Sequence, residues 1–150
     1  MGAWGLDSSE NDSTFDAVGF GIMERCGGVE LSDTGKEAIA EDILKEDPKA
    51  LDPTSEYALS TGPVVLLLKM GAKVPPAKIS AVLCHYTQAL ATDDHPEWSC
   101  FSGRDAAERR AIVEDEMVFC RAALENNGRI PGTAPGCGGI DAAFAGKGYL

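Results

Sequence analysis

The segment from Ser102 to Leu124 carries the clearest structural signal in the sequence. Ser102 and Asp105 have the spacing of a capping box at a helix N-terminus. A seven-residue rhythm follows, and Asn126-Asn127-Gly128 is typical of a helix C-cap. The sequence therefore predicts one long helix. Its rhythm runs through Ala106, Arg109, Val113, Met117, Cys120 and Leu124.

Further helix signals divide the chain before residue 128. The apolar run from Val64 to Met70 is interpreted as a buried helix, because no second strand signal exists to pair with it. We therefore expect an all-α fold, a compact single-domain bundle of five or six helices. The remaining start signals, a capping acceptor or a first-turn proline, stand at Ser13, Thr34, Asp52-Pro53 and Pro75-Pro76.

The chain is long enough for one domain and a tail. At 150 residues, a single domain buries roughly two thirds of the surface of its unfolded chain. From Arg129 onward, glycine and proline dominate and apolar residues are sparse, so this part cannot pack a core of its own. We expect a helical domain over residues 1–128 and an extended or flexible C-terminal tail over residues 129–150.

The sequence is acidic, with 13 Lys and Arg against 24 Asp and Glu and a formal net charge of -11. This charge repels phosphate backbones and anionic membranes, which disfavours nucleic-acid and membrane binding. The acids are spread over every segment, so a solvated surface is favoured over a decoy for a basic partner or a mimic of DNA. The amino terminus lacks a secretory signal pattern and no apolar run is long enough to span a bilayer, which predicts a soluble cytoplasmic protein.

The amino terminus begins MGAWG and continues through Glu10-Asn11-Asp12 to Asp16. This stretch, from Met1 to about Val18, resembles the start of a bacterial family of small proteins, domain of unknown function 4259. A weaker resemblance covers Asp105 to Leu124, where that family carries a charged helix. Because the family has no established activity, the resemblance implies no catalytic residues. Trp4 has glycines nearby on both sides, which favours an indole buried against the first helix over one that stacks on a ligand.

The five cysteines and two histidines supply the candidates for metal or thiol chemistry. Irregular cysteine spacing favours reduced thiols over a disulfide framework, and Cys84 is interpreted as a core residue. Zinc binding by Cys84, His85, His95 and Cys100 is disfavoured. Cys84 and His85 are neighbours on a predicted helix, about 100° apart around its axis, so they cannot easily face one ion, and no Cys-x-x-Cys pair exists. A calcium loop at residues 7–18 lacks the required Gly and Glu. We predict no metal and no cofactor.

No motif brings two catalytic groups together, and the acidic trio Glu114-Asp115-Glu116 is interpreted as a solvated face. We therefore predict no catalytic residues and a non-catalytic protein-interaction domain: an adaptor, an inhibitor-like partner or a subunit of a larger assembly. The alternative is a small thiol- or metal-dependent enzyme that uses Cys137, or His95 with Cys100. The partner and the oligomeric state stay open. The predicted binding residues are Trp4, Phe144, Tyr149 and Leu150.

Overall fold

The computed structural model describes residues 8, 14, 18, 20–26, 33–46, 61–99 and 101–131. Over these ranges the chain is mostly helical and contains no strand, which confirms the all-α class for this part of the protein. Among the described residues, four helices have eight residues or more, where a bundle of five or six helices was predicted. The helix expected after Asp52-Pro53 lies outside these residues, and the helix Phe20–Cys26 has seven residues. The elements are α2 (Phe20–Cys26), α3 (Asp33–Glu46), α4 (Gly62–Lys69), α5 (Pro76–Leu90), the 3-10 helix η3 (Pro96–Trp98) and α6 (Gly103–Glu125).

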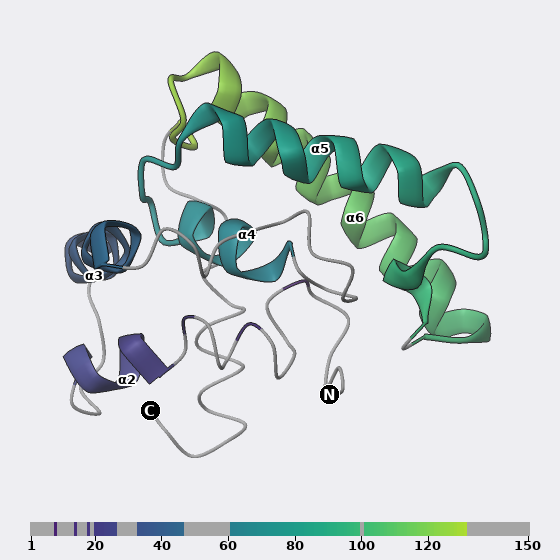
Figure 1. Ribbon diagram of the computed structural model, residues 1–150, viewed down its shortest axis with the longest axis horizontal. Helices are drawn as coiled ribbons and strands as arrows, with labels where there is room; N and C mark the ends of the chain where they lie inside the picture. Colours follow the sequence, from purple (N-terminus) through teal and green to yellow (C-terminus); the bar gives the residue numbers. More distant parts are fainter. Residues whose placement is uncertain are drawn as a thin grey trace.

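The two longest helices, α5 and α6, form a hairpin that dominates the structure, and α4 packs against both of them (Figure 1). The helices α2 and α3 contact each other to one side of this group. The main hairpin is therefore α5 with α6, while α4 contributes a third, shorter layer. Among the described residues, no helix combines the length and the apolar composition needed to span a bilayer.

Helix α4 is buried at every position, as the apolar run from Val64 to Met70 predicts. Pro63 stands in its first turn, where a missing backbone N–H costs nothing. The segment packs against α5 and α6, so a helix with no exposed face is stable here. Val64 and Leu67 are completely buried and lie at the centre of the core.

Helix α5 presents one apolar face to the core. Its buried residues Ile79, Val82, Tyr86 and Ala89 recur at helical spacing, as expected for a helix that begins at Pro76. Cys84 is exposed, so its interpretation as a core residue was wrong. The reason is geometric, because Cys84 lies two positions after Val82 and therefore about 200° around the helix axis.

Helix α6 buries charged side chains along with apolar ones. Arg109 and Val113 are completely buried, and Glu116 is 2% exposed. The interpretation of the acidic trio as a solvated face was wrong for Glu116, although Glu114 and Asp115 are exposed. Glu116 lies three residues after Val113 and seven after Arg109, which places it on the core face of the helix.

The two ends of α6 differ from each other. Ser102 occupies the N-cap position, but its side chain makes no capping hydrogen bond, so the predicted capping box is wrong here. At the other end, Asn127 and Gly128 adopt left-handed backbone conformations, and the Gly128 N–H donates to the Ala123 carbonyl at 2.7 Å. The Val74 N–H donates to the Gly128 carbonyl at 2.9 Å, which ties the end of α6 to the segment before α5.

Helix α3 is attached to the hairpin through its acidic side chains. Glu41 accepts a hydrogen bond from the Lys73 backbone at 2.7 Å. Arg129 Nη2 lies 3.2 Å from Glu41 and 3.3 Å from Glu37. Ile130, two residues into the predicted tail, is 7% exposed and belongs to the core cluster. Residues 129–130 therefore contact the helical body.

Candidate functional site

A cluster of charged and polar side chains lies inside the hairpin, where the sequence predicts none. We call it the buried polar cluster; it consists of Ser8, Tyr86, Glu97, Arg109 and Glu116. Arg109 Nη2 donates to Glu97 Oε1 at 2.5 Å, and the side chains of both residues are completely buried. The same nitrogen donates to the Ser8 hydroxyl at 2.8 Å. The cluster thus joins Ser8 to η3 and α6.

The second carboxylate of the cluster, Glu116, is held by donors from three parts of the chain. It accepts hydrogen bonds from the Tyr86 hydroxyl at 2.6 Å, from the Ser8 backbone N–H at 3.3 Å, and from the Ser8 hydroxyl. The ammonium of Lys69 lies 3.6 Å away. The hydroxyl of Thr61 also contacts that of Tyr86 at 3.0 Å. Each buried carboxylate therefore has a basic neighbour and hydrogen-bond donors, which offset the cost of burying its charge.

These surroundings shift the pKa values of three members of the cluster, Tyr86, Glu97 and Arg109. Burial raises the pKa of Tyr86 well above its usual value, and the charge of Glu116 adds to the effect, so Tyr86 stays a hydroxyl donor. Burial alone would raise the pKa of Glu97, but the hydrogen bond from His85 and the charge of Arg109 outweigh it and lower the pKa. Burial disfavours the charged form of Arg109 and would by itself lower its pKa. Its neighbours, Tyr86 and Glu116 first among them, outweigh burial and raise the pKa of Arg109. The carboxylate of Glu97 and the guanidinium of Arg109 therefore stay charged near neutral pH.

The two histidines do come together, as ring neighbours. Their ring centroids lie 4.9 Å apart at an interplanar angle of 86°. His85 Nε2 lies 2.9 Å from Glu97 Oε2, and His95 Nδ1 accepts a hydrogen bond from the Glu97 backbone N–H at 3.1 Å. Burial, followed by the charge of His85, lowers the pKa of His95. Because a backbone N–H can only donate, neutral His95 carries its proton on Nε2, and its lone pair on Nδ1 is already used.

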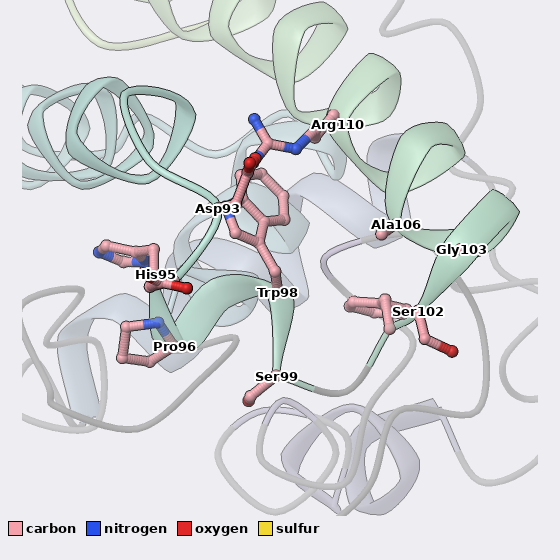
Figure 2. Close-up of a pocket in the computed structure, with 11 residues that line it drawn as sticks. Asp93, His95, Pro96, Trp98, Ser99, Ser102, Gly103, Ala106 and Arg110 are labelled. Carbon is pink, nitrogen blue, oxygen red and sulfur yellow. The ribbon is translucent and has the colours of Figure 1, made fainter.

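A pocket of about 390 Å³ lies between the loop after α5 and the start of α6. In Figure 2, Arg110 lies over the ring of Trp98 with Asp93 beside it, and Ser102 lies across the pocket from His95. The Arg110 guanidinium carbon is 4.5 Å from the Trp98 ring centroid. This volume falls within the range of small-ligand pockets, which makes the pocket a candidate binding site among the described residues.

The Trp98 indole is itself anchored. Its Nε1 lies 3.0 Å from the carbonyl oxygens of Ala89 and Thr92, and the residue is 5% exposed. Arg110 Nη2 donates to the Thr92 carbonyl at 3.0 Å and to Asp93 Oδ1 at 2.7 Å. The pocket therefore presents an arginine that is held in place by an aromatic face, a carbonyl and a carboxylate.

Most of the sequence-predicted site residues lie outside the part of the chain that the structure describes. Trp4, Phe144, Tyr149 and Leu150 lie outside the described residues, as do Cys100 and Cys137. Of the predicted candidates that the structure describes, only His95 lines the pocket. Within the described ranges, no group of three or more His, Cys, Asp or Glu side chains is arranged to hold a metal ion.

Sequence reasoning missed the buried carboxylates and the pairing of Arg110 with Trp98. One signal was present: Arg109 stands in the apolar rhythm of the last helix, where a charged residue needs a buried partner. Comparison with known proteins gave no matching protein family, curated protein or solved structure. The resemblance to domain of unknown function 4259 therefore stays a prediction.

Proposed function

We propose that this protein is a non-catalytic protein-binding domain and that the pocket beside Trp98 is its recognition site. The observation that carries the proposal is Arg110, a cation fixed on an aromatic ring at a pocket wall. Arginine and tryptophan are the residues that most often dominate the energetics of protein interfaces. A side chain fixed before binding loses little conformational entropy on binding, so it favours recognition.

The interior supports the same function. The ionisable groups of the buried polar cluster are paired with one another, and Glu97 and Arg109 are completely sealed from solvent. A general acid or base must reach the proton that it transfers. Side chains that are buried and paired with one another are suited to holding Ser8 on α5 and α6, not to reacting with a substrate.

The alternative, a small thiol- or metal-dependent enzyme, has less support. His95 would need a free lone pair to bind a metal or to accept a proton, but its Nδ1 accepts the Glu97 N–H at 3.1 Å. Coordination through Nε2 would require the other tautomer and would break that hydrogen bond. Cys100 and Cys137, the thiols of this proposal, lie outside the described residues.

An array of random peptides tests the proposed function. Peptides that bind the wild-type chain are assayed again with Arg110→Lys, which keeps the charge but loses the planar fork that stacks on Trp98. The matched control is Arg104→Lys on the same helix, whose side chain is 90% exposed. We expect binding to fall in Arg110→Lys and to persist in the control. Equal binding by all three chains, or no binding peptide, would refute the proposal.

A further inference from the structure

We propose that the pocket recognises a carboxylate of the protein partner, which replaces Asp93 on Arg110. This inference rests on the proposed function and adds the chemistry of the recognised group. The carboxylate can come from an Asp or Glu side chain or from the end of the partner chain.

Arg110 is positioned to receive a carboxylate before any ligand arrives. Its guanidinium lies 4.5 Å from the Trp98 ring centroid, and its side chain is 28% exposed. Within the described residues, Arg110 hydrogen-bonds only through Nη2, to Thr92 and Asp93, so Nε and Nη1 are not engaged. A guanidinium fork binds a carboxylate through two parallel hydrogen bonds, which is the strongest and most directional form of this pair.

Asp93 is an internal substitute for that carboxylate. Its Oδ1 accepts one hydrogen bond from Arg110 at 2.7 Å, through a single nitrogen. The Asp93 side chain is 97% exposed, so solvent hydrates its carboxylate fully when the bond opens. Exposed ion pairs of this kind add little stability. A partner carboxylate that makes two hydrogen bonds can therefore replace Asp93 at small cost.

The other groups of the pocket are compatible with a carboxylate ligand. His95 is neutral because its pKa is lowered, and Ser99 and Ser102 add hydroxyl donors to the lining. Asp94 is a second acid at the pocket, but it is exposed and its charge is screened by solvent. Among the described residues that line the pocket, Arg110 is the one side chain with a permanent positive charge. It is thus the group that an anionic ligand would contact.

The test uses two changes, one in the peptide and one in the protein. Binding peptides from the array are synthesised with free or amidated ends, and with each Asp or Glu replaced by Asn or Gln. We expect one of these replacements to weaken binding about tenfold or more, and the affected form identifies the source of the carboxylate. Asp93→Asn should tighten binding of the carboxylate form several-fold, because the internal competitor loses its charge.

The control for net charge is Asp115→Asn, which removes an exposed carboxylate of α6 that does not line the pocket. It should leave binding within about twofold of wild type. Because the Asp93 side chain is 97% exposed, we expect its replacement to leave the fold intact, and thermal melting of each variant checks this. Peptides that bind equally well with or without carboxylates, or equal affinities for the two variants, would overturn the inference while leaving the proposed function standing. If no peptide binds, both fail.

Discussion

Replacement of Arg109 by methionine tests whether the buried polar cluster holds the fold together. Methionine keeps much of the length of the side chain and removes the charge. Glu97 would then be a completely buried carboxylate with His85 as the remaining hydrogen-bond partner of its side chain among the described residues. Removal of one partner from a buried ion pair costs about 3–5 kcal/mol. For a chain of this size, that cost lowers the melting temperature by roughly 6–20 °C.

The matched control is Arg104→Met on the same helix. The Arg104 side chain is 90% exposed and pairs with Glu108 four residues later. An exposed pair of this type contributes roughly 0.5 kcal/mol or less. The assay is the free energy of unfolding at pH 7 from denaturant titration, with thermal melting as a second measurement. If Arg109→Met loses no more stability than Arg104→Met, the cluster does not hold the fold together.

The pH dependence gives a second check on the same variant. In the wild type, the pKa of Glu97 lies below its usual value of 4.5, so its contribution to stability is complete above that pH and is lost as the pH falls through the folded pKa. Without Arg109, burial becomes the main influence and raises the pKa of Glu97. Protonation then stabilises the folded variant, so the stability gap to wild type should narrow between pH 7 and pH 5. A constant gap would contradict the assignment of Glu97 as a buried anion.

Other features of the structure give independent tests. Gly128→Ala should lower the free energy of unfolding by about 1–3 kcal/mol in denaturant titrations, because the backbone there is left-handed and a Cβ would lie 2.3 Å from the Val74 carbonyl oxygen. The control is Gly103→Ala, whose Cβ would meet nothing within 4 Å. A loss of stability in Gly128→Ala no larger than in this control would refute the prediction. Cys84 should react with maleimide in the folded protein, whereas Cys120, whose pKa burial raises to about 12, should react only on unfolding; similar rates would be inconsistent with the structure. NMR should show that the pKa of His95 lies below 6.5 and that the neutral ring carries its proton on Nε2. The contribution of His95 to stability should fall as the pH drops below 6.5. A titration midpoint above 6.5 would show that burial does not lower this pKa.

Helices α4, α5 and α6 could be predicted because their signals are local. Pro76 starts α5, Gly128 ends α6, and the spacing of Ile79, Val82 and Tyr86 marks the face of α5 that packs inward. Each of these signals acts within a few residues of the element that it shapes. Local rules therefore sufficed for the type and approximate bounds of these elements.

The candidate site could not be predicted in the same way, because its contacts join distant positions. Ser8 and Glu116 are separated by 108 residues, and Arg109 reaches Glu97 across the hairpin turn. A charged residue on a helix is usually exposed, because burial of an unpaired charge costs free energy. It can be buried only where the fold places a partner beside it. The pairing of Arg110 with Trp98 likewise depends on how the loop folds back on α6, which no spacing rule specifies.

The contact of Ser8 with α6 has a consequence for how this chain can be divided. A fragment that began at Thr61 would keep the three core helices but would leave Arg109 and Glu116 without the hydroxyl and amide that Ser8 supplies. Ser8 thus completes the interior of the hairpin, although it precedes Arg109 by 101 residues and Glu116 by 108 residues in the sequence. In an alignment of related chains, we therefore expect the residues at positions 8, 109 and 116 to be substituted together and not independently of one another.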